Sequence, residues 1–180
     1  MRERSDEALM AAWSNGSMAA FEALYARYRG PLYRYFLRLS GDTVRANDLY
    51  QGCWEKVIRA RGQYRPTGPF RAWVFRIAHN HAMDGFRRMP PETELGALDT
   101  ASPQPDPADH AASLERAGRL ADALAGLPPE QRDTLLLKLE GGLDLETIAR
   151  VTGVGRETAK SRLRYATARL KHVLSGERTQ

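Results

Sequence analysis

A run of basic and polar side chains near the C-terminal end has the composition and spacing of a DNA-reading helix. The segment Leu143 to Leu174 predicts two helices joined by a tight turn. Outward positions of the second helix carry side chains that can hydrogen-bond to base edges or phosphates. These candidate contacts are Arg156, Glu157, Lys160, Ser161 and Arg164. The pattern is typical of a helix-turn-helix, whose second helix enters the major groove.

The same segment supplies the cap, the turn and the apolar faces that such a pair of helices needs. Asp144 can cap the first helix, and the turn contains Gly153 and Gly155. We expect both glycines to provide a positive φ angle or a close approach of the backbone. The apolar positions of the first helix are Leu145, Ile148 and Ala149, and those of the second are Ala159, Leu163, Ala166 and Leu170.

A second group of basic and aromatic residues occupies the segment Tyr64 to Arg88. Aromatic rings stack on unpaired bases while Arg and Lys follow the backbone, so this mixture suits single-stranded nucleic acid. Trp73 and Ile77 have the spacing of core positions and are better explained as core. The loop Gly62 to Pro69 and polar positions of the next helix could form a pocket for a flipped base. The candidate residues are Tyr64, Arg65, Asn80, His81, Asp84, Arg87 and Arg88.

Charge is distributed unevenly along the 180 residues, whose net charge is +5. Residues 1–88 hold 15 basic and 8 acidic side chains, and residues 112–180 hold 12 and 9. Residues 89–111 hold five acidic side chains, no basic one and five of the ten prolines. Two basic segments around an acidic one favour a polyanionic partner, because neutralised phosphates release their counterions.

Several other classes of protein are disfavoured by the sequence. No apolar run approaches the roughly 20 residues of a membrane span, and the first residues lack an apolar signal-peptide core. A single cysteine, Cys53, predicts a buried thiol and a cytoplasmic, reducing compartment. His79 and His81 lie two positions apart on a helix and point away from each other, so we expect no shared metal ion. Without a catalytic motif, we expect neither an enzyme nor a cofactor.

Helical periodicity predicts an all-α fold with two small helical domains, residues 1–88 and 112–180. A flexible acidic, proline-rich linker, residues 89–111, is expected to join them. In the first domain we expect five helices, over residues 5–13, 17–28, 31–39, 44–61 and 70–88. In the second we expect a helix over residues 113–125, another after Pro128-Pro129, and the helix-turn-helix.

Short motifs along nearly the whole chain resemble those of one family. They are Leu32 to Tyr35, Asp48 to Gln51, Phe70 to Ala78, Leu127-Pro128 and Thr158 to Arg162. In this order, on the two sides of an acidic segment, they resemble regions 2 and 4 of the bacterial sigma-70 family. The chain is most similar to its two-domain form, the extracytoplasmic-function (ECF) sigma factors.

The resemblance implies a function and a set of partners. Region 2 would bind the clamp helices of the largest subunit of core RNA polymerase, and would melt and read the promoter −10 element. Region 4 would read the −35 element and contact the flap of the second-largest subunit. An anti-sigma factor is a further implied partner, and neither a cofactor nor a membrane is implied. The polymerase-binding residues would be Asp48, Gln51, Glu55 and Lys56.

Three departures from the family pattern and one rival function stay open at this point, and the first departure is the glycine-rich turn Gly153-Val154-Gly155. Gly52 stands where the family commonly has an acid, and Ala159 replaces a larger aliphatic residue. The rival is a helix-turn-helix regulator that binds duplex DNA without polymerase. In such a regulator, the aromatic and basic segment, residues 64–88, would have no role.

Overall fold

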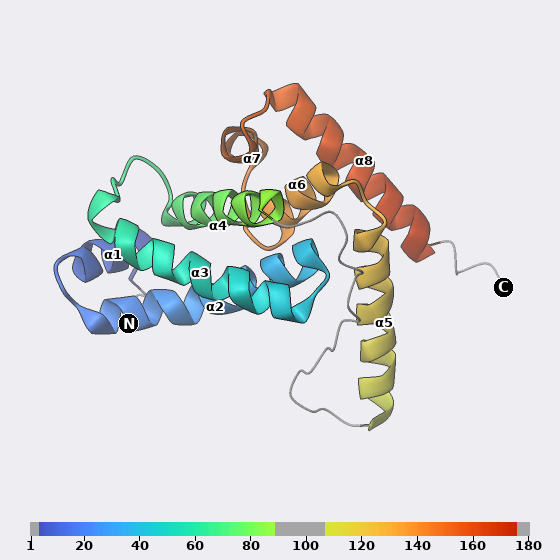
Figure 1. Cartoon of the computed structure of the whole chain (residues 1–180), viewed down its shortest axis with the longest axis horizontal. Coiled ribbons are helices and arrows are strands. Elements are labelled where there is room, and N and C mark those ends of the chain that lie inside the picture. The colour runs from blue at the N-terminus through green and yellow to red at the C-terminus, as the bar shows by residue number, and fades with distance from the viewer. Residues whose placement is uncertain (1–3, 89–106, 176–180) are drawn as a thin grey trace.

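Helices account for the regular structure in the residues that the computed structural model describes, 4–88 and 107–175. The expected linker lies largely outside these residues. No strand occurs within the two described ranges, which agrees with the predicted all-α class. In chain order the elements are α1 (Asp6–Ser14), α2 (Met18–Ser40), α3 (Thr43–Ala60), the 3-10 turn η1 (Arg61–Gln63), α4 (Phe70–Arg87), α5 (Pro107–Ala125), α6 (Pro129–Leu139), α7 (Leu145–Thr152) and α8 (Arg156–Ser175) (Figure 1).

Four of the helices begin where a short polar side chain accepts a hydrogen bond from a backbone N–H three residues later. This geometry satisfies one of the donors that a helix N-terminus leaves unpaired. The oxygen-to-nitrogen distances are 3.2 Å for Ser5, 3.3 Å for Ser17, 2.9 Å for Asp42 and 2.7 Å for Asp144. The predicted caps at Ser17 and Asp144 are confirmed.

Helix α2 runs without a break through Pro31, so the expected separate helices over 17–28 and 31–39 are wrong. Proline in a helix interior removes one hydrogen bond and costs about 3 kcal/mol. Large side chains on both sides of Pro31 are almost fully buried, and each contributes roughly 1.5–3 kcal/mol. Their packing outweighs the defect. They are Tyr28, Leu32, Tyr35 and Phe36.

Helix α5 begins at Pro107, six residues before the expected start at Ser113 and inside the expected linker. Proline fits the first turn of a helix because the N–H that it lacks would be unpaired there. The acidic, proline-rich composition had placed the end of the linker at residue 111. The helix-start signal of Pro107 outweighs that composition. Figure 1 shows the early part of α5 extending away from the other helices.

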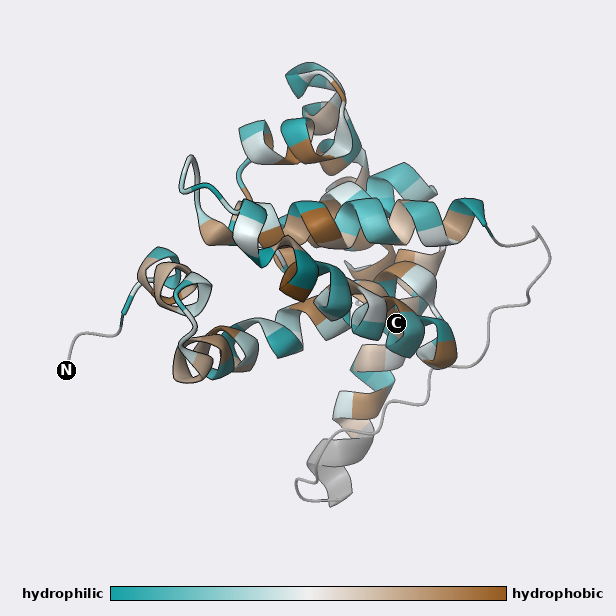
Figure 2. Cartoon of the chain, turned by 60° about the vertical axis from the view of Figure 1, so that its left-hand side comes forward, coloured by the Kyte–Doolittle hydropathy of each residue, from teal (hydrophilic) through white to brown (hydrophobic). Residues whose placement is uncertain are grey.

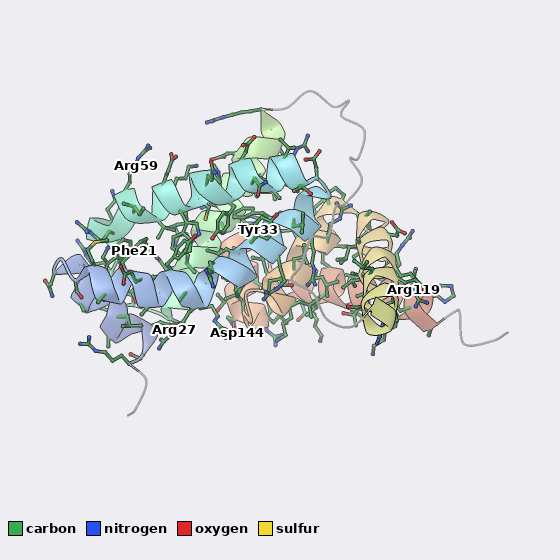
Figure 3. The ribbon with its side chains drawn as sticks, turned by 90° about the horizontal axis from the view of Figure 1, so that it is seen from below. Phe21, Arg27, Tyr33, Arg59, Arg119 and Asp144 are labelled. Carbon is green, nitrogen blue, oxygen red and sulfur yellow. The ribbon has the colours of Figure 1, made fainter. Side chains whose placement is uncertain are left out.

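Helices α1, α3 and α4 pack against α2. Figure 2 shows apolar positions recurring along helices that are polar elsewhere. The rings of Phe21 and Tyr33 reach from α2 toward α3, where they contact Trp54 and Tyr50 at centroid distances of 6.1 and 5.6 Å (Figure 3). Cys53 is fully buried in this core, as predicted.

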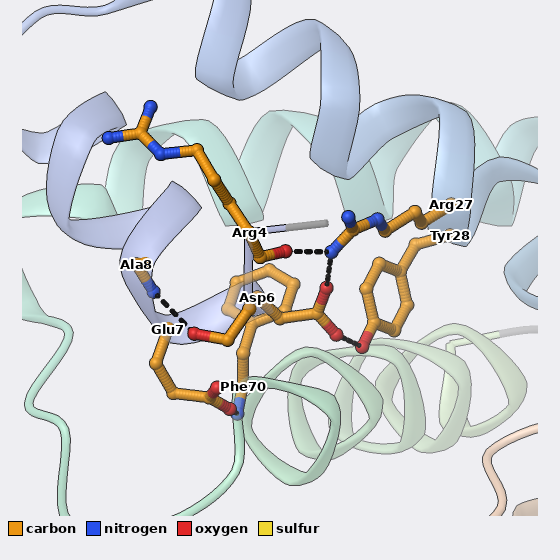
Figure 4. Close-up of polar contacts among 8 residues, drawn as sticks. Arg4, Asp6, Glu7, Ala8, Arg27, Tyr28 and Phe70 are labelled. Carbon is orange, nitrogen blue, oxygen red and sulfur yellow. Dashed lines mark hydrogen bonds and ion pairs between the residues drawn. The ribbon is translucent and has the colours of Figure 1, made fainter. Parts of the chain in front are cut away.

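Helix α1 is bound to the middle of α2 and to the first residue of α4 through two carboxylates (Figure 4). Asp6 accepts hydrogen bonds from Arg27, at 2.6 Å, and from the hydroxyl of Tyr28. Glu7 accepts a 3.0 Å hydrogen bond from the backbone N–H of Phe70, the first residue of α4. Because Pro69 provides no capping side chain, Glu7 caps α4 from a different helix.

Helices α5 to α8 form the second half of the molecule, and α8 packs against the other three. Its predicted inward stripe is confirmed: Ala159 and Ala166 are fully buried, and Leu163 and Leu170 pack against the core. The two halves touch, because α6 lies against α2 and α7 lies against α4 (Figure 1). Within the described ranges, no helix is both long and apolar enough to cross a bilayer.

Replacing Pro31 by Ala tests the cost of the proline in α2. The substitution restores the missing helix hydrogen bond, while a more flexible unfolded chain offsets part of the gain. We expect P31A to raise the free energy of unfolding by about 1–2 kcal/mol, measured by urea denaturation. A loss of stability would mean that packing of the proline ring is worth more than the missing bond.

Candidate nucleic-acid interface

The helix-turn-helix is held by a cap at one end of α7 and a glycine at the other. Gly153 ends α7 with a φ of 69°, in the left-handed region that an L side chain rarely adopts. The expectation for Gly155 is wrong, because its φ is not positive and a Cβ there would meet nothing within 4 Å. Ala159 lies fully buried on the inward side of α8.

The predicted recognition residues lie on the open side of α8. Arg156, Glu157, Lys160 and Arg164 are exposed, and Ser161 is half-buried. Arg156 lies 3.4 Å from a carboxylate oxygen of Glu157 and 3.9 Å from one of Glu146 in α7. These contacts are exposed and weak, so a phosphate or base edge can replace them.

Tyr165 was missed by sequence reasoning. Its ring is 56% exposed, and the guanidinium of Arg164 lies 5.0 Å from the ring centroid. This cation–π contact restricts the orientation of Arg164 before any ligand arrives. The signal was present in the sequence, because Tyr165 follows a predicted contact directly and does not belong to the inward stripe.

The candidates for single-strand binding are spread along α4 and its preceding loop rather than gathered in one pocket. An 18-residue helix such as α4 is about 27 Å long, so its two ends cannot contact the same base. Tyr64 is only 9% exposed and packs against Phe70 and Trp73 at centroid distances of 6.1 and 5.3 Å. The structure therefore does not place the Tyr64 ring where a base could stack on it. The exposed candidates are Arg65, Asn80, Arg87 and Arg88.

His81 and Asp84 face α3 instead of the loop. Asp84 lies 3.8 Å from Lys56 in α3 and pairs with Arg87, which lowers the pKa of the Asp84 carboxyl. Burial, followed by the nearby Lys56 charge, lowers the pKa of His81. His81 and Asp84, both predicted to contact DNA, therefore lie next to α3, the helix predicted to bind polymerase.

Gly52 permits this close approach of α4 to α3. A Cβ at this position would lie 2.5 Å from Nε2 of His81, inside van der Waals contact. The departure from the family pattern at Gly52 is thus explained by packing: the space that a side chain would need is filled by an imidazole ring.

A basic cleft lies where the loop and α4 meet α7. Its volume is about 270 Å³, and no acidic side chain lines it. Arg65, Trp73 and Arg76 line it from one half of the molecule, and Arg150 lines it from the other. Arg76 was not among the predicted contacts, although it precedes Asn80 by one helical turn and is likewise exposed.

The exposed side of α3 carries one continuous stripe. Asp48, Gln51 and Glu55 are exposed, but Lys56 is partly buried toward Asp84. Two apolar residues continue the stripe at helical spacing: Val44 is 72% exposed and Ile58 is 48% exposed. Figure 3 shows the neighbouring Arg59 extending from α3 into solvent. Sequence reasoning missed Val44 and Ile58 because it selected only polar residues.

Comparison with known proteins gives a family match for each half of the chain. The Sigma-70 region 2 family profile matches residues 24–89, and the Sigma-70 region 4 profile matches residues 123–172. The chain belongs to the sigma-70 family of RNA polymerase sigma factors. Members of this family are transcription factors rather than enzymes. Within the described ranges, moreover, no group of His, Cys, Asp and Glu side chains could hold a metal ion.

Curated relatives place the chain in the ECF group. It is 35% identical over 162 residues to ECF RNA polymerase sigma factor SigL of Mycobacterium tuberculosis, covering 87% of this chain and 89% of that protein. It is 32% identical over 167 residues to RNA polymerase sigma factor CarQ of Myxococcus xanthus, covering 92% and 95%. The rival function of a polymerase-independent regulator has no support among these relatives.

Solved structures show the same fold. CnrH, solved in complex with the cytosolic domain of CnrY, aligns with a TM-score of 0.71 at 26% identity, covering 97% of this chain and 99% of CnrH. Sigma factor RpoE from Bartonella quintana, solved in complex with the anti-sigma factor NepR, aligns with a TM-score of 0.66 at 21% identity, covering 88% and 98%.

A double-mutant cycle tests the contact between Gly52 and His81. We expect G52A to lower the free energy of unfolding by about 1–3 kcal/mol, because the added methyl displaces the imidazole ring. The H81A background removes the obstacle, so the same substitution should cost less there. Thermal and urea unfolding of the four proteins measures the coupling. An equal cost of G52A in both backgrounds would assign the effect to something other than His81.

Proposed function

We propose that this ECF sigma factor divides promoter recognition between two basic surfaces and binds core RNA polymerase through the exposed face of α3. Residues 1–88 form the region 2-like domain, which binds polymerase and opens the −10 element. Residues 112–180 form the region 4-like domain, which reads the −35 element. The observation that carries the proposal is the exposure of both basic surfaces and of the α3 stripe in one chain that belongs to the sigma family.

The −35 assignment rests on α8. A helix in the major groove needs several outward side chains that reach base edges, together with phosphate contacts that fix its position. Arg164 and Lys160 are four residues apart, one turn along the exposed face, and Arg156 lies at the helix start. Glu157 and Ser161 complete the set of base or phosphate contacts.

The −10 assignment rests on α4 and its loop. Exposed Arg65, Arg76, Arg87 and Arg88 provide positive charge along one helix length, which suits a strand that runs beside it. Asn80 offers both a donor and an acceptor for a base edge. His81 and Asp84 also lie on α4, and their proposed role is to hold α4 against α3.

Polymerase binding is assigned to Asp48, Gln51, Glu55 and Lys56, with Val44 and Ile58 as apolar contacts. A protein interface gains most of its affinity from buried apolar or aromatic residues, while surrounding charges give specificity. The stripe has this composition. By the family resemblance, its counterpart is the clamp helices of the largest polymerase subunit, and region 4 contacts the flap of the second-largest.

Two finer assignments follow from the proposal. The protein works in the cytoplasm, where core polymerase and promoters are found, and it acts without an active site or cofactor of its own. An anti-sigma factor is a further candidate partner, because CnrH was solved with the cytosolic domain of CnrY and RpoE with the anti-sigma factor NepR.

Reconstitution with core RNA polymerase tests the proposed function. The full chain added to core enzyme should give one stable holoenzyme on gel filtration and initiate specific transcripts from promoter fragments. Core enzyme alone serves as the control. Specific duplex binding by the chain without any association with core would favour the regulator.

Truncation of Arg164 tests the −35 assignment. We expect R164A to weaken binding to the selected −35 duplex by about 1–3 kcal/mol and to random duplex by much less, because a bidentate base contact is lost. Fluorescence anisotropy measures both affinities. Lys171, exposed at the far end of α8, provides the matched control K171A. Equal losses on the two duplexes would make Arg164 a phosphate contact.

Ile58 provides the corresponding test of polymerase binding. We expect I58D to weaken holoenzyme formation at least about tenfold, because a charge would enter the apolar part of the interface. Competition binding to core enzyme measures the change. Glu22, exposed on α2 outside the stripe, gives the control E22K. Unchanged affinity in I58D would place the polymerase contact elsewhere.

A further inference from the structure

A crevice is formed by the C-terminal ends of α2 and α4 together with α6 and α8. Its volume is about 440 Å³, within the range of sites that bind small organic ligands, roughly 300–1,000 Å³. It shares no lining residue with the basic cleft beside the loop. Of the residues proposed above to contact polymerase or DNA, Arg87 alone lines it. The proposed function therefore leaves most of this hollow without a role.

One wall of the crevice is apolar. Leu39 comes from the last turn of α2, and Met83 and Phe86 come from the end of α4. Leu39 is only 4% exposed, whereas Met83 and Phe86 are half-buried and keep surface that a ligand can cover. Removing apolar surface from water is favourable, so this wall suits an aliphatic or aromatic body.

Arg132, from α6, lines the crevice with a guanidinium whose position is fixed. Its terminal nitrogens donate hydrogen bonds to the backbone carbonyls of Leu39, at 3.1 Å, Ala125, at 2.8 Å, and Leu127, at 3.1 Å. A guanidinium has five N–H groups, so two remain. The one on Nε is buried and has no hydrogen-bond partner in the described parts of the chain. Burial also lowers the pKa of Arg132, because water is withdrawn from its charge, and a bound anion would offset that loss.

Two further guanidinium groups line the crevice. The side chain of Arg162, on α8, is half-buried and forms no ion pair or hydrogen bond with the residues that the structure describes. Arg87, at the end of α4, is exposed and pairs with Asp84. Like charges around one hollow repel each other, so an anion between these arginines is stabilising.

Two carboxylates of the same lining limit the charge of the ligand. Asp133 is 4% exposed, and its oxygens lie 2.7 Å from the hydroxyl of Tyr35 and 2.9 Å from Nδ1 of His79. Glu130 is exposed in the first turn of α6. These negative charges oppose a dianion such as a phosphate ester, while the three arginines still attract a single charge. An uncharged ligand would leave the arginines without compensation.

We infer that this crevice binds a small amphipathic monocarboxylate, whose body covers Met83 and Phe86 and whose carboxylate lies between Arg132 and Arg162. The planar carboxylate and guanidinium groups match each other through paired hydrogen bonds, which favours this headgroup over other single charges. The body provides the apolar contact that a simple inorganic anion lacks.

Binding also changes the charge that the chain offers to DNA. Arg87 is one of the proposed −10 contacts, and Arg162 directly follows Ser161, one of the proposed −35 contacts, in α8. A carboxylate beside these arginines neutralises part of the positive charge that a polyanion would use, so it lowers the affinity for promoter DNA. This consequence rests on the proposed function, whereas the binding of the carboxylate does not.

Isothermal titration calorimetry of the full-length protein tests the site with three probes. Phenylbutyrate has both the body and the charge, phenylbutanol has the body alone, and acetate has the charge alone. We expect phenylbutyrate to bind at least about tenfold more tightly than either of the other two. In NMR spectra of the complex, the ε-methyl signal of Met83 should shift. The signals of Met10 and Met18, which lie outside the crevice, should not.

R162Q and E130Q should change the affinity for phenylbutyrate in opposite directions. We expect R162Q to weaken binding about tenfold, because a partner of the carboxylate is lost, and E130Q to strengthen it about threefold, because an opposing charge is lost. Arg169 is exposed on the same helix outside the crevice, so R169Q removes the same charge and is the matched control. R169Q should leave the affinity unchanged.

Three results would overturn the inference. They are equal affinities for phenylbutyrate and phenylbutanol, equal affinities of R162Q and R169Q for phenylbutyrate, and an unshifted Met83 signal in the presence of saturating phenylbutyrate. Each would mean that the arginines and the apolar wall do not act together on one ligand.

Fluorescence anisotropy tests the consequence for DNA. The DNA is a fork junction that carries a duplex −35 element and an unpaired −10 strand. We expect saturating phenylbutyrate to weaken its binding at least about threefold in the wild type and in R169Q, but not in R162Q. Unchanged DNA affinity with the crevice occupied would overturn the effect on DNA. Failure of the proposed function gives a different result: phenylbutyrate still binds, but the wild type bound to core polymerase initiates from no promoter.

Discussion

Continuity of α2 is the constraint on which the rest of the structure depends. This one helix of 23 residues contacts α1, α3, α4, α5 and α6, so both halves of the protein assemble on it. Its first half carries the core of the region 2-like bundle, and its second half carries Arg34, Tyr35 and Arg38, which meet α6. A break at Pro31 would uncouple these two groups of contacts. The buried aromatic side chains on both sides of the proline prevent that break.

Acidic and basic residues have different tasks in this protein. The well-buried carboxylates Asp133 and Glu140, and those of Asp6 and Glu7, hold helices together. Most arginines of α4 and α8 remain exposed, and the acids paired with Arg156, which are Glu146 and Glu157, are exposed as well. The positive charge of α4 and α8 is thus left available to a polyanion, while these four carboxylates, with the arginines that they bind in α2, set the geometry. Net charge alone, at +5, conceals this division.

Local sequence signals predicted much of the fold and of the recognition helix, because caps and apolar periodicity act over a few residues. Asp144 and the stripe through Ala159 are examples. Features decided by distant packing could not be predicted. Pro31 is accommodated because α2 side chains on both sides of it pack against other helices. Tyr64 is covered by residues on the following helix, and Asp133 finds its partners about 55 and 100 positions away in the chain. Neither the apolar periodicity nor the spacing of residues in the sequence indicates such contacts.

The cap that Glu7 provides to Phe70 has a consequence for the modularity of the fold. Helix α1 lies before residue 24, where the match to the region 2 family begins, yet it fixes the first turn of α4 and the end of the adjoining loop. A chimaera built by exchanging only the matched segment between two sigma factors would therefore separate α4 from the residue that orients it. To exchange promoter preference between relatives, α1 must therefore be transferred together with the segment that it caps.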